Sequence, residues 1–169
     1  MRYFTSDQHF FDSGILTYVG RPYNNAEEMS DDIAERLIAK TKDADEVYIL
    51  GDILNSRTSP ALFDTSREIL ERLGIHKRPF HLVQGNHDVL TVEEYLKMGF
   101  ASVEKISSIT LDGMKTMLTH DPAMVQPMNT LAICGHVHTL FSENWQPARN
   151  TFAINVGVEA RGYEPVSEE

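Results

Sequence analysis

Cysteine is almost absent from this chain. Cys134 is the only cysteine among 169 residues, so no intrachain disulfide can form and stability has to come from a packed core. A chain of this length buries roughly two thirds of its unfolded surface when it folds as one unit. We therefore expect residues 1–169 to form a single domain, in a reducing compartment such as the cytoplasm.

Long apolar runs and basic residues are also scarce. No apolar run approaches the ~18 residues of a membrane span, and the N-terminus reaches Asp7 too early for a signal peptide, so we expect no membrane partner. Lys and Arg number 15 against 25 Asp and Glu, a formal net charge of −10. Long nucleic acids are bound through clustered Lys and Arg. A small phosphate ester, including a nucleotide, is a better-matched partner, and nothing in the composition indicates an oligomeric state.

Short apolar runs that end in polar residues recur along the chain and predict an α/β protein. Strands are expected at residues 3–6, 47–50 and 80–83. Helices are expected where a capping residue precedes a helical apolar pattern: after Asn25, after Ser59-Pro60 as far as Gly74, and after Thr91. From Val103 onward, short apolar segments separated by Pro and Gly predict a mainly β half.

Five of the seven histidines lie in polar segments directly after apolar strand candidates: His9, His87, His120, His136 and His138. In an extended segment, residues two positions apart point to the same face. Asp7 and His9 form one such pair, and His136 and His138 form another. Asp7 and His9 could therefore bind one ion together, and the spacing of His136 and His138 again favours a shared direction.

Carboxylate, imidazole and amide ligands together suit manganese, iron, zinc, cobalt or nickel better than calcium. A carboxylate such as Asp52 can bridge two ions, and two ions about 3.5–4 Å apart can clamp a phosphate during in-line displacement. Taken singly, each cluster can also be read as a turn or cap, because Asp, Asn and His often bond the backbone there. Their joint occurrence in one order favours a metal site.

The motif series resembles that of the calcineurin-like metallophosphoesterases, in particular the compact bacterial and phage members. It consists of Asp7-x-His9, Gly51-Asp52, Gly85-Asn86-His87-Asp88, His120 and Gly135-His136-x-His138, and it spans nearly the whole chain. The resemblance implies a four-layer α/β/β/α sandwich with two central mixed β-sheets and the metals at strand ends.

The resemblance also implies roles for individual residues. Asp7, His9, Asp52 and His138 would surround one divalent ion, manganese by preference, and Asp52 would bridge to a second. Asn86, His120 and His136 would complete the second site, with a hydroxide between the ions as nucleophile. His87 would donate a proton to the departing oxygen as a general acid, and Asp88 would orient the His87 ring. A plain helix cap is the alternative for Asp88.

One departure from the compact relatives concerns the substrate. Phe10-Phe11-Asp12 stands where those relatives commonly carry a Gly-His pair. Phe10 could line the mouth of the site and stack on an aromatic group, or belong to the core. Arg21 could bind a phosphate through two hydrogen bonds, or form an ordinary ion pair.

The resulting hypothesis is a metal-dependent phosphoesterase that favours phosphodiesters. Two alternatives stay open. The first is a metal-binding scaffold of the same fold, which the retention of His87 and of every expected ligand disfavours. The second is a nuclease, which the acidic balance disfavours.

Overall fold

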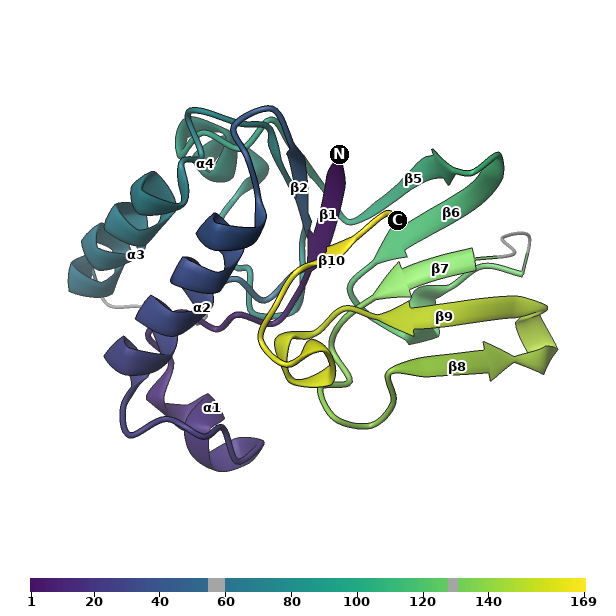
Figure 1. Cartoon of the computed structure of the whole chain (residues 1–169), viewed down its shortest axis with the longest axis horizontal. Helices are drawn as coiled ribbons and strands as arrows, with labels where there is room; N and C mark the ends of the chain where they lie inside the picture. The colour runs from purple at the N-terminus through teal and green to yellow at the C-terminus, as the bar shows by residue number, and fades with distance from the viewer. Residues whose placement is uncertain (55–59, 128–130) are drawn as a thin grey trace.

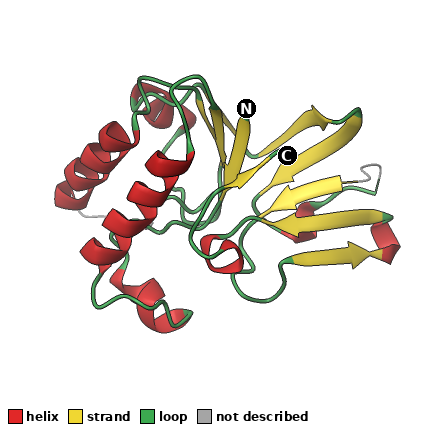
Figure 2. Cartoon of the chain, in the orientation of Figure 1, coloured by secondary structure: helices red, strands yellow, loops and turns green. Residues whose placement is uncertain are grey.

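The computed structural model describes residues 1–54, 60–127 and 131–169, leaving aside the side chains of residues 60–66. Two five-stranded sheets face each other, and the α-helices lie on the outer side of one of them (Figures 1 and 2). The first sheet has the order β10 (Val166–Ser167), β1 (Arg2–Thr5), β2 (Glu46–Ile49), β3 (Phe80–Val83), β4 (Ser102–Glu104). The second has the order β5 (Ile106–Leu111), β6 (Met114–Thr119), β7 (Leu131–Cys134), β9 (Thr151–Asn155), β8 (Glu143–Gln146).

Both sheets are mixed, as expected. In the first sheet, β1 to β4 run parallel and β10 is antiparallel to β1. In the second, β6, β7 and β9 run parallel, while the two outer strands are antiparallel to their neighbours. Carboxyl ends of parallel strands meet at one edge of a sheet. The segments that follow β1, β2 and β3, and those that follow β6 and β7, are thereby brought together.

The helices begin where the capping residues predict. Asn25 accepts a hydrogen bond from the Glu28 backbone and begins α2 (Ala26–Lys40), and Thr91 forms a capping box with Glu94 at α4 (Val92–Lys97). The chain also forms α1 (Ser13–Tyr18) and α3 (Pro60–Leu73). Ser59, expected before α3, lies outside the described residues. Gly74, at φ +79°, follows the end of α3.

Side chains along β2 and the residue after it point to opposite faces of the first sheet, and these faces belong to two separate core layers. Val47 and Ile49 face the helices and pack with Met29, Ile33 and other residues of α2. Leu50 belongs to the layer between the sheets, with residues that come from both of them: Phe4, Val83, Leu118, Ile133 and Val156. Each such fully buried side chain contributes about 1.5–3 kcal/mol of burial free energy. The two sheets are therefore held face to face by apolar packing.

The outer face of the second sheet is covered thinly. Val125 follows the 3₁₀ turn η1 (Pro122–Met124) and packs on Met117 and Ala132 of the sheet. Two further 3₁₀ turns, η2 (Pro147–Arg149) and η3 (Val158–Arg161), flank β9. Within the described ranges, no helix is both long and apolar enough to cross a membrane. The predicted α/β class with two mixed central sheets is confirmed.

Candidate metal centre

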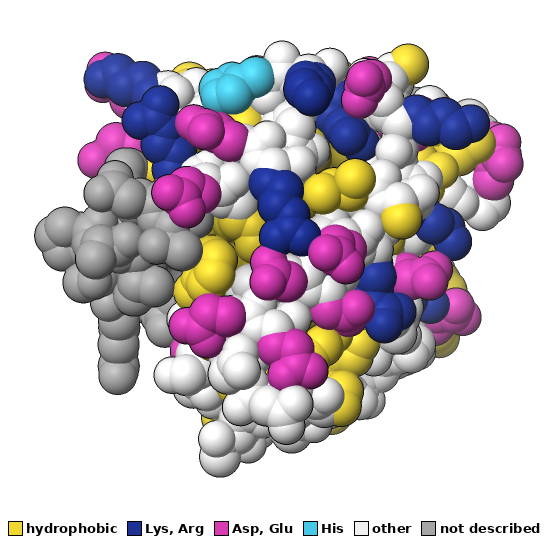
Figure 3. Space-filling model, turned by 60° about the vertical axis from the view of Figure 1, so that its left-hand side comes forward, with side chains coloured by type: hydrophobic (Ala, Val, Ile, Leu, Met, Phe, Trp, Pro, Cys, Tyr) yellow, Lys and Arg dark blue, Asp and Glu magenta, His cyan; other side chains and the backbone are white. Residues whose placement is uncertain are grey.

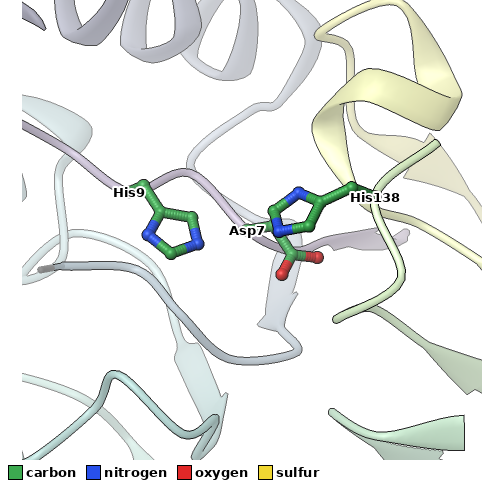
Figure 4. Close-up of side chains that lie close together, drawn as sticks. All are labelled: Asp7, His9 and His138. Carbon is green, nitrogen blue, oxygen red and sulfur yellow. The ribbon is translucent and has the colours of Figure 1, made fainter. Parts of the chain in front are cut away.

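Two groups of potential metal ligands lie at the strand ends. In each group the three ligand atoms lie within 4.8 Å of one another, close enough to hold one cation. The first group consists of Asp7, His9 and His138, and the second of Asp52, His120 and His136. Figure 4 shows the three side chains of the first group, which come from the segment after β1 and from the segment after β7.

Asp52, a member of the second group, also lies close to the first. Its Oδ2 atom is 3.6 Å from Nε2 of His9 in the first group and 3.2 Å from Nε2 of His120 in the second. The Asn86 Oδ1 atom is 3.0 Å from Nε2 of His120, which places this amide beside the second group. The structure thus brings together all seven residues expected to bind metal, and their role as ligands remains a prediction.

The imidazoles are held so that ring nitrogens remain for a cation. The Nδ1 of His120 is 2.7 Å from the Leu50 carbonyl oxygen, and that of His138 is 3.1 Å from Glu159 Oε1. An Nδ1–H that donates to these oxygens leaves the lone pair on Nε2. Both ring nitrogens of His9 are buried, and neither has a hydrogen-bond partner among the described residues. A buried imidazole in this state fits a metal ligand.

The backbone at the site is unusual. Five of the seven predicted ligands have positive φ, the left-handed region: Asp7 at 60°, His9 at 50°, Asp52 at 54°, His136 at 70° and His138 at 46°. Such a conformation costs a residue other than glycine roughly 1–3 kcal/mol and clusters at functional sites. The turns direct the ligands toward one another directly after the strands end. Strain of this kind supports a function at this place.

Two glycines allow the loops to approach closely. A Cβ atom at Gly51 would lie 2.7 Å from the backbone of Gly85, and Gly51 also has φ +89°. A Cβ atom at Gly135 would lie 2.6 Å from Oδ2 of Asp7. Real side chains do not tolerate such distances, so no larger residue fits without displacing ligands. The motif glycines are therefore required by the geometry of the ligand loops.

The electrostatics of the site favour positive charge. Burial raises the pKa of Asp7 above its ordinary value, while the nearby His120 and His138 oppose that effect. Burial would lower the pKa of His120, but the hydrogen bond to Asp52 and the charges of Asp7 and Asp52 raise it to about 9. Without a cation, the carboxylates thus hold a proton on His120. A bound divalent ion would supply the same positive charge and displace that proton.

His87 lies next to the first group. Its ring centroid is 5.0 Å from that of His9, and its backbone N–H donates to Oδ1 of Asp52. Together with His9 and His138, it lines a cavity of about 370 Å³. The His87 ring thus lies beside the first ligand group, at the wall of this cavity.

Asp88 braces the ligand loops. Its carboxylate accepts hydrogen bonds from the backbone N–H of Gly85 and of Asp52, each at 2.7 Å, and from that of Ile53 at 3.2 Å. Burial raises the pKa of Asp88 to about 6. These contacts hold the segments after β2 and β3 together. They differ from the expected contact with the His87 ring and from a cap of α4, which is formed by Thr91.

The two residues considered for substrate contact occupy other positions. Phe10 is 0% exposed and belongs to the core between the helices and the first sheet, so its ring cannot stack on a bound substrate. The Arg21 side chain is fully buried and donates to the backbone oxygens of Asp7 and Gln8. The expected contact with substrate is therefore wrong for both residues, because their side chains are buried and are not exposed at the site.

Sequence reasoning missed the role of Glu159. Its Oε1 accepts a hydrogen bond from Arg21 Nη2 at 2.6 Å and lies 3.1 Å from His138 Nδ1, so it orients a predicted ligand. Glu159 stands 138 residues from Arg21 in the sequence, and no local pattern links the two. The sequence signal is an acid a few residues after β9, which is too common to interpret.

The chain belongs to the calcineurin-like phosphoesterase superfamily, whose domain model matches residues 4–165. An uncharacterized protein of Methanocaldococcus jannaschii is 34% identical over 170 residues, which cover 98% of this chain and 85% of that protein. A protein of unknown function from Aquifex aeolicus is 26% identical, with a TM-score of 0.76 over 99% of this chain and 95% of that one. A nuclease of Pseudomonas putida shares the fold at 22% identity, with a TM-score of 0.53 over 81% of this chain and 61% of that one.

Family and site together define a metal-dependent phosphoesterase. The domain model gives the class of reaction, and the two ligand groups provide the residues that can bind metal. The substrate of such an enzyme is a phosphate ester. The number and identity of the ions, and the choice among esters, belong to the proposal that follows.

Proposed function

We propose that this protein hydrolyses phosphodiesters at a centre of two divalent cations, with manganese preferred and iron, zinc, cobalt or nickel as alternatives. The observation that carries the proposal is the position of Asp52, whose Oδ2 atom lies within 3.6 Å of Nε2 of His9 and of His120. A carboxylate placed in this way can bridge two cations. Its imidazole and carboxylate neighbours form a donor set suited to these transition metals.

Each predicted ligand has a place in this proposal. The first cation would be held by Asp7, His9, Asp52 and His138, and the second by Asp52, Asn86, His120 and His136. When bound, the pair supplies an activated hydroxide and neutralises charge on the phosphate. The remaining tasks fall to side chains of the protein: Glu159 fixes the ring of His138 and Asp88 fixes the loop of Asp52.

His87 is proposed as the general acid. During hydrolysis, a bond forms between phosphorus and the oxygen of a water molecule, and the bond to the leaving oxygen breaks. In this proposal the departing alkoxide takes a proton from the His87 ring, whose centroid lies 5.0 Å from that of His9, and the attacking water molecule gives up one proton to the solvent. Proton transfer of this kind accelerates a reaction typically by about 10²–10⁴.

A preference for diesters is supported by two cavities that open at the site. One holds about 370 Å³ and is lined by His9, His87 and His138; the other holds about 780 Å³ and is lined by Asn86, His120 and His136. A phosphodiester carries two substituents on phosphorus, and a monoester carries one. Each cavity can therefore take one substituent of a diester.

A small ester is the proposed substrate, acted on by residues 1–169 as one domain in the cytoplasm. Acidic and basic side chains are interspersed on the face in Figure 3, where no broad basic surface is seen. The chain as a whole has a formal net charge of −10. The net charge disfavours extended nucleic acid, which binds through gathered positive charge.

The test is a hydrolysis assay with aryl phosphomonoester and aryl phosphodiester substrates in manganese, cobalt and nickel. We expect release of the aryl alcohol from the diester, with a higher kcat/KM than from the monoester. No release from either ester in any metal would contradict the proposal and favour a metal-binding scaffold. Metal content measured on the same sample separates this result from a failure to load the cations.

A further inference from the structure

The larger of the two cavities has an apolar wall. Val89, Val92, Ile106 and Met124 line it, and these side chains are 60%, 45%, 37% and 55% exposed. They come from four separate segments: the loop after β3, α4, β5 and η1. Apolar side chains exposed singly are ordinary on a protein surface. Four that converge on one cavity indicate a binding surface.

The wall is continuous with the site of the proposed function. The same cavity of about 780 Å³ is lined by Asn86, His120 and His136, which make up the second ligand group. A phosphate held at these residues would direct one of its substituents along the wall. His87 lines the other, smaller cavity, so the leaving oxygen that it protonates lies on that side. The larger cavity is left for the substituent that stays on phosphorus.

The larger cavity carries little positive charge. Of the described residues that line it, Lys105 is the one Lys or Arg, and Asp88 and Asp121 are the acids. A chain of further phosphates would need several cations along its path. One Lys with two Asp in the lining favours an uncharged substituent. The volume also lies in the range of pockets that enclose whole small ligands, which is about 300–1,000 Å³.

We propose that this cavity binds the retained substituent of the diester and selects an uncharged group large enough to cover the apolar wall, of which a nucleoside is the representative. Such a group packs on Val89, Val92, Ile106 and Met124, while Gln84 and Thr119 are polar side chains within the same cavity. This inference rests on the proposed hydrolysis. It names a substrate class, the nucleoside 5′-phosphate esters of a small alcohol.

The experiment compares two diesters that release the same leaving group, p-nitrophenol: its ester with methyl phosphate and its ester with thymidine 5′-phosphate. Both retained groups are primary alkyl esters, so their chemical reactivity is matched and only the group in the cavity differs. We expect kcat/KM to be at least about tenfold higher for the thymidine ester, since the larger group buries enough apolar surface for that factor.

The variant V89T/M124S replaces two residues of the wall with polar side chains of similar or smaller size. We expect it to reduce the preference for thymidine over methyl by about fivefold or more, because the apolar contact is lost. Met114→Ser is the matched control, since Met114 is a methionine 48% exposed in β6 that does not line the cavity. The control should keep the full preference.

The outcomes separate this inference from the proposed function. Hydrolysis of neither ester would overturn the proposed function and this inference with it. Hydrolysis of both at equal kcat/KM would overturn the inference alone, as would a preference unchanged in V89T/M124S. A thymidine oligonucleotide cleaved with a higher kcat/KM than the thymidine ester would also overturn it, in favour of a nuclease.

Discussion

Arg21 and Glu159 form a buried ion pair that joins the two ends of the chain at the site, with Nη2 and Oε1 2.6 Å apart across 138 residues of sequence. The Arg21 guanidinium also donates to the Asp7 carbonyl oxygen, and Glu159 reaches His138. Asp7 and His138 belong to the first ligand group. The ion pair therefore holds two predicted ligands, Asp7 and His138, in position.

Removing the charge of Glu159 should destabilise the fold. Glu159→Gln leaves the guanidinium of Arg21 buried without its anion, which typically costs about 3–5 kcal/mol. Urea unfolding in the presence of a metal chelator measures this cost. Glu164→Gln is the control, because Glu164 and its partner Lys40 are each 49% exposed, and an exposed pair contributes about 0–1 kcal/mol. Equal losses in the two variants would contradict a structural role for the Arg21–Glu159 pair.

The His87 ring can be separated from metal binding. His87→Ala should lower kcat by about 10²–10⁴, because the departing oxygen loses its proton donor, while the metal content of the purified protein stays unchanged. His76→Ala, at an exposed histidine outside the site, should change neither quantity. Parallel loss of metal and activity in His87→Ala would instead make His87 a ligand. Unchanged activity would remove it from the chemistry.

The close approach at Gly135 gives a third prediction. Gly135→Ala places a Cβ atom against Ser6 and the Asp7 carboxylate, so the first ligand group is displaced. We expect its Mn²⁺ affinity, measured by calorimetry, to fall by at least about tenfold. Gly162→Ala is the control, because a Cβ there meets nothing within 4 Å and only the left-handed backbone opposes it, at a cost of about 1 kcal/mol. Equal Mn²⁺ affinity in the two variants would contradict the packing described at Gly135.

A pH effect on stability is expected from His81, which lies away from the site in β3. Burial lowers the pKa of its imidazole from 6.5, although Glu46 and Glu104 act in the opposite direction. A histidine whose pKa is lowered on folding stabilises the protein fully above the unfolded pKa, and loses that contribution as pH falls through the folded pKa.

The free energy of unfolding should therefore decrease from about pH 7.5 to about pH 5 by a smaller amount in His81→Gln than in the parent protein, since the variant lacks this titration. Urea unfolding at the two pH values, in chelator, measures both decreases. The His81 Nδ1 is 2.8 Å from Ser102 Oγ, a contact that a Gln amide can still make. Identical decreases in the two proteins would contradict the lowered pKa.

Much of this arrangement could be predicted because its signals are local. The capping residues Asn25 and Thr91 mark where α2 and α4 begin, since a cap bonds the backbone within three residues. Likewise, ligands that directly follow strands are recognised from short motifs. Parallel pairing then brings the segments after β1, β2 and β3 to one sheet edge without further information.

The rest depends on contacts between residues far apart in the chain. Phe10 directly follows the polar residues Asp7 to His9, as a residue at the mouth of a site can, and only the packing of the helices on the first sheet buries it. The sequence leaves Arg21 open to a phosphate or to an ion pair, because its partner, Glu159, is 138 residues away. Asp88 was expected at the His87 ring, whereas it binds the backbone of a loop 36 residues away. No local pattern encodes such pairings.

The most direct test of the account is a crystal of this protein soaked in Mn²⁺ and measured at the manganese absorption edge. Two anomalous peaks about 3.5–4 Å apart are expected on either side of Asp52, one beside Asp7, His9 and His138 and the other beside His120 and His136. A single peak, or peaks away from these side chains, would contradict a binuclear centre bridged by Asp52.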